Sequence, residues 1–319
     1  MDKDVEEAEL PESFHPSTCT KLGLLKTASK HQLFYEHHAS PVRSADGSVT
    51  HCLLVCGMYS TASSALHTLR HLTSHPGFEV VVMDNRGVGL SDAPTGRYRT
   101  SDMAQDVVAL LDHLKWKGRR MVHVIGVSLG GMVAQELVLA VPERIASLVL
   151  TSTRAGPIPE WPSYKVGGML ARQITRTVRG PAHAAALAVD CLFPSFWLDQ
   201  PDDLMEGSSR REVLETQYIL KAQGPQPSVA GKLGQFFAVT SHYVSPHKLA
   251  TILATIPRVE IIVGDHDVID EAKAKIALLS AEKATQFETE DGASKEKSDP
   301  VVTVVEAKRQ GHGTIDYDP

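Results

Sequence analysis

The sequence predicts an α/β protein: a mostly parallel, twisted β-sheet flanked by helices, with a helical cap inserted late in the chain. Short β-branched, apolar runs alternate with amphipathic segments of helical length, as expected for parallel strands covered on both faces. The alternation stops between residues 154 and 253, where proline and aromatic residues gather, and then resumes. We therefore expect one α/β core, residues 21–153 and 254–319, interrupted by a cap, residues 154–253.

Each expected element of the amino-terminal half has its own local pattern. Residues 1–20 are acidic and contain proline and serine, so we expect a disordered extension. Apolar or β-branched runs predict strands near residues 22–27, 32–36, 51–55, 78–83, 121–125 and 147–151. Apolar side chains at helical spacing predict helices over 62–72 and 101–114, and good helix formers followed by Pro142 predict another over 132–140.

The pattern beyond the cap is shorter. Strands are expected at residues 258–263 and 301–306, with a helix-like run at 271–282 between them. The charged stretch 286–299 is expected to be a loop without visible chemistry.

Composition restricts the classes of function. The 319 residues are 42% hydrophobic with a net charge of −6, which is ordinary for a globular protein and does not favour nucleic acid as a partner. No apolar run approaches the ~20 residues that span a bilayer, and the acidic start lacks the pattern of a signal or transit peptide. The four cysteines are too scattered for a disulfide framework. These features predict a cytoplasmic protein.

The most informative segment is the run G-V-S-L-G-G at residues 126–131. It follows a buried strand and opens a helix, so Ser128 stands on a tight turn where glycines give the necessary room. The start of a helix also offers backbone N–H groups to developing negative charge. This context predicts a nucleophile elbow, with Ser128 as the nucleophile.

A serine hydroxyl needs a histidine to take its proton and a carboxylate to orient that histidine. Candidates for both follow strands late in the chain. The sequence G-D-H-D at residues 264–267 directly follows one strand, and G-H-G at 311–313 comes soon after the next. The order serine, aspartate, histidine is the order of α/β-hydrolase triads.

The chain resembles the α/β-hydrolase fold superfamily, in its capped esterase and lactonase-like branch, over residues 20–313. Four motifs carry the resemblance: C-G-M at 56–58, where the family usually has H-G-x; D-x-R-G-x-G-x-S at 84–91; G-x-S-x-G-G at 126–131; and the pair G-x-x-D at 264–267 with G-H at 311–312. The resemblance implies a Ser128, Asp267 and His312 triad, with no cofactor and no metal.

Two choices within the triad stay open. The family places its acid three residues after the glycine, which favours Asp267 over Asp265; Asp270 is expected to cap the next helix. His312 is favoured as the base because glycines flank it and it follows a strand. The alternative bases are His266, His242 and His247.

The resemblance also implies an oxyanion hole made of two backbone N–H groups, one from Leu129 and one from Met58. Backbone donors do not depend on side-chain type, so Cys56 in place of the usual histidine leaves the hole possible while changing what holds its loop. Arg86 is expected to brace loops rather than to take part in catalysis.

Several other residues are candidates for binding roles. Trp161, Trp197 and Phe237 in the cap are expected either to line the substrate pocket or to form the core of the cap itself. The histidines at 37–38 and at 67, 71 and 75 are expected to be surface or capping residues rather than metal ligands.

The resulting hypothesis is a serine hydrolase that cleaves a carboxylic ester, lactone or related acyl compound through an acyl-enzyme. The alternatives are an acyltransferase or C–C bond hydrolase with the same triad, and a non-catalytic binding protein of the same fold. The family normally has a helix after its histidine, whereas this sequence ends at Pro319, so we expect that helix to be missing or the sequence to be a truncated product. The expected partner is a small-molecule acyl substrate; the oligomeric state stays open.

Overall fold

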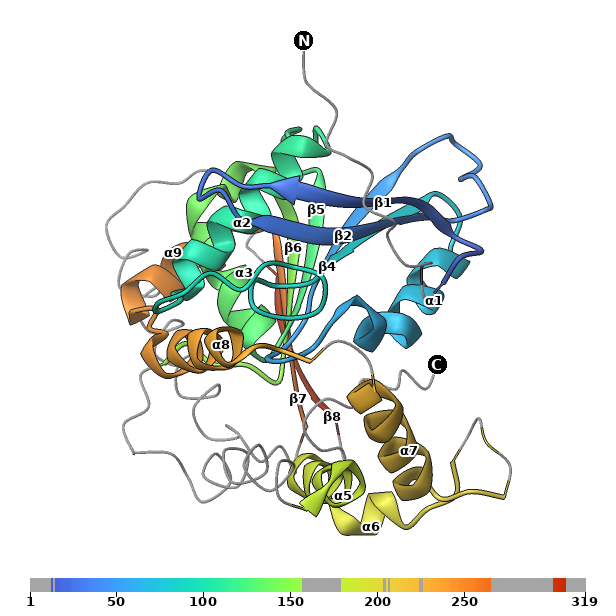
Figure 1. Ribbon diagram of the computed structural model, residues 1–319. Coiled ribbons are helices and arrows are strands. Elements are labelled where there is room, and N and C mark those ends of the chain that lie inside the picture. The colour runs from blue at the N-terminus through green and yellow to red at the C-terminus, as the bar shows by residue number, and fades with distance from the viewer. Residues whose placement is uncertain are drawn as a thin grey trace.

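A computed structural model describes most of the chain. The described residues are Ser13, 15–156, 179–202, 205, 207–223, 226–264 and 301–307. They form an eight-stranded sheet with helices on both faces (Figure 1). Its spatial order is β1-β2-β4-β3-β5-β6-β7-β8. The predicted fold class is confirmed.

The strands follow the expected positions closely. They are β1 (Cys19–Lys26), β2 (Gln32–Ala39), β3 (Thr50–Val55), β4 (Phe78–Met83), β5 (Val122–Val127), β6 (Ile145–Thr151), β7 (Arg258–Gly264) and β8 (Val301–Ala307). β1 pairs antiparallel with β2, and β2 antiparallel with β4. All the other neighbouring strands are parallel.

Helices cover both faces of the sheet. In chain order they are η1 (Ala62–Ala65), α1 (Leu66–Ser74), α2 (Thr100–His113), α3 (Leu129–Ala140), η2 (Pro142–Arg144), α5 (Pro181–Leu192), α6 (Ser195–Leu198), α7 (Arg210–Gln223), α8 (Val229–Ser241) and α9 (Pro246–Thr255). α3 contacts α2, α8 and α9, whereas α1 packs on the other side of the sheet against β4 (Figure 1).

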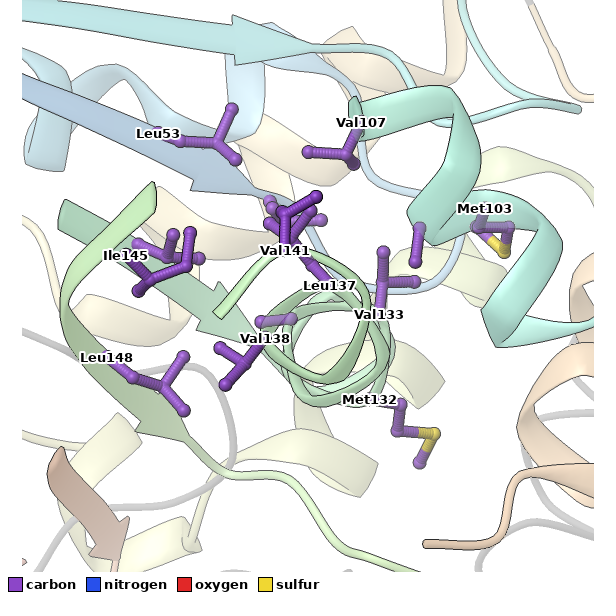
Figure 2. Packing of buried hydrophobic residues seen from close by; sticks show 14 of the residues in the cluster. Leu53, Met103, Val107, Met132, Val133, Leu137, Val138, Val141, Ile145 and Leu148 are labelled. Carbon is purple, nitrogen blue, oxygen red and sulfur yellow. The ribbon is translucent and has the colours of Figure 1, made fainter. Parts of the chain in front are cut away.

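The alternation of side chains along the central strands explains this double cover. On β3, Leu53 and Val55 belong to the large hydrophobic cluster under α2 and α3, whereas Cys52 and Leu54 belong to the cluster under α1. Successive side chains of a strand point to opposite faces, so a continuous apolar run can fill both cores. Figure 2 shows the larger cluster, in which Val133 and Leu137 of α3 gather with Leu53 and Val107.

The amino-terminal boundary differs from the expectation where the chain is described. β1 begins at Cys19, inside the segment predicted to be disordered, and the hydroxyl of the buried Ser13 donates a hydrogen bond to Glu36. Pairing with β2 and these polar contacts order a stretch that composition alone would leave without structure.

The described residues of the expected cap include the helices α5 to α8 and most of α9. α5, α6 and α7 lie together below the carboxyl ends of the parallel strands (Figure 1). They share a small hydrophobic cluster of their own, built on Val189, Phe193, Trp197 and Leu198. By contrast, α8 and α9 place Ala238, Ile252 and other side chains in the large cluster of the sheet.

Two further properties concern the whole described part of the chain. None of its helices combines the length and the apolar character needed to cross a bilayer. Among the described residues, Cys19, Cys52 and Cys56 form no disulfide bond.

Candidate active site

Ser128 lies at the point in the sheet where the strand order reverses. β3 is followed by β4 on one side, and β5 then pairs with β3 on its other side. In open parallel sheets, ligands bind outside the carboxyl ends of the strands at such a switch point. Ser128 directly follows β5 and precedes α3, which is the position predicted for the nucleophile.

The backbone of Ser128 has the geometry of a nucleophile elbow. Its φ of 53° and ψ of −117° lie in a region that residues with a side chain rarely adopt. The surrounding contacts hold it there: the N–H of Ser128 donates to the carbonyl of Thr151, and the hydroxyl of Thr153 donates to the carbonyl of Ser128. The side chain itself is partly exposed. The turn therefore presents the hydroxyl while the backbone is fixed.

The glycines of the motif are required by close approach rather than by their own φ. A Cβ on Gly126 would lie 2.7 Å from the carbonyl oxygen of Gly130, and a Cβ on Gly131 would lie 2.6 Å from Cβ of Thr153. A Cβ on Gly130 would overlap the carbonyl of Val55. Each contact is shorter than real Cβ atoms allow, so the elbow needs all three glycines.

The two expected oxyanion-hole residues belong to two segments beside the serine. Leu129 is the first residue of α3, so its N–H belongs to the turn whose donors have no acceptor within the helix. Met58 stands in the loop after β3, and a Cβ on the preceding Gly57 would lie 3.4 Å from Cβ of Ser128. The loop expected to supply the second donor thus passes beside the nucleophile.

Two side chains that the sequence analysis did not single out hold this loop. The buried amide of Asn85 donates to the carbonyl of Cys56 at 2.9 Å. Gln235 of α8 accepts from the N–H of Tyr59 and donates to the carbonyl of Arg86, and its side chain is fully buried. These contacts hold the loop after β3 in place. In this loop, Cys56 stands where the family usually has histidine. Gln235 is distant in sequence and gave no local signal.

Arg86 braces the core as expected. Its guanidinium forms a bidentate pair with Asp106 of α2 at 2.6 and 2.7 Å, and also donates to the carbonyl of Asp102. Both partners are buried, and Arg86 also lies over the ring of Tyr98. The pair links the turn after β4 to α2.

The acid and base fall beyond the described residues. Asp265, Asp267, Asp270, His266 and His312 all lie outside them, as does Trp161. What is described is the pair of strands before them: β7 ends at Gly264 and β8 at Ala307, and these two residues are register partners. Both strands run parallel to β5, so their carboxyl ends open on the same edge of the sheet as Ser128.

Two alternative bases are described. His242 follows α8, is buried, and its Nδ1 lies 2.8 Å from the hydroxyl of Thr100. Burial, reinforced by Arg154, lowers the pKa of His242 to about 4, so this ring is neutral near pH 7. His247 is exposed in the first turn of α9.

The remaining candidate pocket residues lie in different surroundings. Trp197 stacks on Phe193 with ring centroids 5.4 Å apart, and the guanidinium of Arg210 lies over the Trp197 ring, 4.6 Å from its centroid. Phe237 of α8 is half-buried under the guanidinium of Arg97, at 4.9 Å. Trp197 thus packs within the small cluster of α5–α7, whereas Phe237 belongs to the helix that carries Gln235.

Comparison with known proteins identifies the family. The sequence profile described as "alpha/beta hydrolase fold" matches residues 53–213. The chain belongs to this family. The match includes the second half of β3, the turn after β4, the elbow and α3.

Curated relatives match over less than half of the chain. A 3-oxoadipate enol-lactonase of Acinetobacter baylyi is 33% identical over 138 residues, covering 41% of this chain and 48% of the relative. A poly(3-hydroxyalkanoate) depolymerase of Ectopseudomonas oleovorans is 35% identical over 135 residues, covering 42% and 46%. The chain thus spans about half the length of the curated relatives it matches.

Solved structures are similar over nearly the whole fold. A thermophilic esterase from Thermogutta terrifontis superposes with a TM-score of 0.64 at 21% identity, covering 92% of each chain. The enol-lactonase from Burkholderia xenovorans superposes with a TM-score of 0.61 at 21% identity, covering 91% of this chain and 93% of that one. At 21% sequence identity, these structural similarities establish the fold alone.

Proposed function

We propose that this protein is a serine hydrolase that cleaves a carboxylic ester, lactone or related acyl compound. The observation that carries the proposal is the left-handed backbone of Ser128 at the end of β5, beside the loop after β3. A serine held in a strained turn, with its hydroxyl partly exposed above the sheet edge, has the geometry of an activated nucleophile.

The proposed reaction runs in two steps. Ser128 attacks the acyl carbonyl while His312 takes the hydroxyl proton, and Asp267 orients the imidazole. The N–H groups of Leu129 and Met58 stabilise the oxyanion, each contributing about 3 kcal/mol to the transition state. The leaving group takes the proton from His312, which then activates water to release the acid from the acyl-enzyme.

The roles of Asp267 and His312 are supported by the topology of the strands before them. β5, β6, β7 and β8 are consecutive neighbours in the sheet and all parallel. Residues that follow the carboxyl ends of such strands meet at one edge. Asp267 and His312 come shortly after β7 and β8, as Ser128 comes directly after β5.

The proposed substrate class is supported by the relatives. One matched relative is named an enol-lactonase and another a depolymerase, and a similar fold is that of an esterase. A lactone is a cyclic ester, so lactonase and esterase names fit the same attack by serine on an acyl carbonyl. We assign selectivity within this class to the cap, residues 154–253, and the chemistry to the core.

A fluorophosphonate probe tests the proposal directly, because it reacts covalently with activated serines. We expect stoichiometric labelling of the wild-type chain at Ser128, and none for Ser128→Ala. The substitution removes one partly exposed hydroxyl and should leave the unfolding midpoint nearly unchanged. A folded wild-type protein that does not label would favour the non-catalytic binding protein instead.

Turnover of p-nitrophenyl esters of graded chain length then defines the substrate. Ser128→Ala should lower kcat by ~10⁶-fold, as loss of the nucleophile does in a comparable triad. Adding a primary alcohol to the assay separates hydrolysis from acyl transfer, because a transferase would form the new ester in place of the free acid. Activity that survives in Ser128→Ala would require another nucleophile.

A further inference from the structure

The edge of the sheet farthest from β8 carries a cluster of three different potential metal ligands. β1 pairs with β2 so that Cys19 lies directly opposite His38, and Glu36 stands two residues before His38 on the same strand. Residues opposite each other, and residues two apart on one strand, share a face of the sheet. The pairing therefore brings Cys19, Glu36 and His38 together on one face.

The ligand atoms are close enough for one ion. Sγ of Cys19, a carboxylate oxygen of Glu36 and a ring nitrogen of His38 all lie within 4.8 Å of one another. Nε2 of His38 is 3.0 Å from Oε2 of Glu36. Tetrahedral zinc, with bonds of ~2.0 Å to N and O and ~2.3 Å to S, separates its ligand atoms by roughly 3.3–3.5 Å. Small side-chain adjustments satisfy that geometry.

The cluster is buried and already oriented by outer hydrogen bonds. The side chains of His38 and Glu36 are 0% and 3% exposed, and Cys19 is half-buried. The hydroxyl of Ser13 donates to Oε2 of Glu36 at 2.6 Å, and the hydroxyl of Thr18 lies 3.1 Å from Nδ1 of His38. Metal-binding imidazoles and carboxylates are held by contacts of this kind. This cluster is also separate from the elbow, because β4 and β3 lie between β2 and β5.

We propose that Cys19, Glu36 and His38 form a Zn²⁺ site that fastens β1 and the segment before it to β2. A thiolate, an imidazole and a carboxylate suit zinc, whereas Mg²⁺ and Ca²⁺ prefer oxygen ligands alone. A water molecule fills the fourth position. On binding, the thiol proton of Cys19 leaves to solvent. His38 then keeps its other proton on Nδ1, and this Nδ1–H donates a hydrogen bond to the hydroxyl oxygen of Thr18.

The site departs from the expectation that no histidine of this chain binds metal. His38 was expected to be a surface or capping residue and is instead fully buried. The sequence between Cys19 and His38 does not reveal that the two are paired across β1 and β2. The cluster is also the one group of metal-ligand side chains at such distances within the ranges that the structure describes. The same side chains can also pair without metal, because Nε2–H of His38 can donate a hydrogen bond to Glu36. The experiment distinguishes the metal-bound form from the metal-free form.

Zinc titration of the full chain against a chromophoric chelator tests the proposal. We expect one tight equivalent for the wild type, a loss of at least 100-fold in affinity for Cys19→Ser, and an unchanged affinity for His37→Gln. His37 is the matched control, because it neighbours His38 on β2 and lies near Glu79 instead, with Nε2 and Oε2 3.3 Å apart. Wild-type protein without a tight equivalent, or Cys19→Ser with wild-type affinity, would overturn the proposal.

Cobalt substitution reports on the ligands without altering the fold. A thiolate bound to Co²⁺ gives a charge-transfer band in the near ultraviolet, which we expect for wild type and His37→Gln and not for Cys19→Ser. Zinc should also raise the Tm of the wild type and leave that of Cys19→Ser in place. A cobalt complex without the band would exclude Cys19 as a ligand. Labelling of Ser128 should be the same in all three proteins.

Discussion

The sheet core around Ser128 and the helices α5–α7 are held together in different ways. The core buries a large cluster that extends over both neighbours of β3 and much of α2 and α3. Where they are described, helices α5–α7 share the small cluster around Phe193 and Trp197. The charged contacts differ likewise: Arg86 and Asp106 are buried in the core, whereas Asp190, paired with Arg211, is 54% exposed. As far as the two regions are described, the core around Ser128 is the more extensively packed.

The largest expected effect tests whether the chemistry is confined to the core. Asp267→Asn should lower kcat by ~10⁴-fold, because the histidine loses the carboxylate that orients it. Asp265→Asn should have a mild effect and serves as the matched control, since it makes the same change two residues away. Ester hydrolysis measured side by side decides between them, and the opposite ranking would move the acid to Asp265.

The two ion pairs compare the stability of the regions directly. Arg86→Met leaves Asp106 buried without its bidentate partner and should lower the free energy of unfolding by about 3–5 kcal/mol. Arg211→Met removes an exposed pair with Asp190 and should cost about 0–1 kcal/mol. Urea unfolding measures both. Equal losses would mean that the helices α5–α7 are as tightly integrated as the core.

Acidification should weaken the contact between α8 and α2. Because the pKa of His242 is lowered to about 4 in the folded protein, the unfolded chain binds this proton more readily. Stability from this residue is therefore complete above pH ~6.5 and falls as the pH drops toward 4, by about 3 kcal/mol in all.

The measurement is urea unfolding at pH 7.5 and pH 5, with His242→Gln as the control. The variant keeps a polar side chain near Thr100 but cannot titrate, so it should lose less stability between the two pH values. An identical loss in both proteins would assign the effect to other groups, among them His37, His51 and His123, whose pKa values are also lowered by burial.

The smallest effects concern the aromatic side chains expected in the cap. Replacing Trp161, Trp197 or Phe237 with alanine should change the relative kcat/KM values across an ester chain-length series. The change should correspond to ~1–3 kcal/mol in activation free energy, because each methylene contributes about that much to discrimination between substrates. Fluorophosphonate labelling of Ser128 should stay the same. A wild-type profile in all three would mean that these residues form helix–helix cores and that the pocket has other walls.

The sequence predicted the parts of the fold that depend on local patterns. β-branched runs predicted the strands. The spacing of Gly126, Gly130 and Gly131 predicted the elbow, because other parts of the chain approach these positions too closely for a side chain. Cys52 and Cys56 both lie in the cluster under α1, because residues four apart along an extended segment share one face of the sheet.

The features that the sequence did not predict depend on contacts between distant residues. Gln235 reaches Tyr59 across 176 positions, and Ser13 reaches Glu36 across 23. No periodicity encodes such contacts, because each depends on where the folded elements come together. The start of β1 was missed for the same reason: its order comes from β2, rather than from its own polar sequence.

The strained conformation at Ser128 sets a trade-off between stability and activity. A left-handed residue other than glycine costs about 1–3 kcal/mol of folding free energy. Ser128→Gly would relieve that strain and is expected to raise the melting temperature while removing the reactive hydroxyl. Efforts to make this protein more heat-resistant should therefore leave position 128 alone and look to the exposed surfaces of α5–α7, where changes do not reach the elbow.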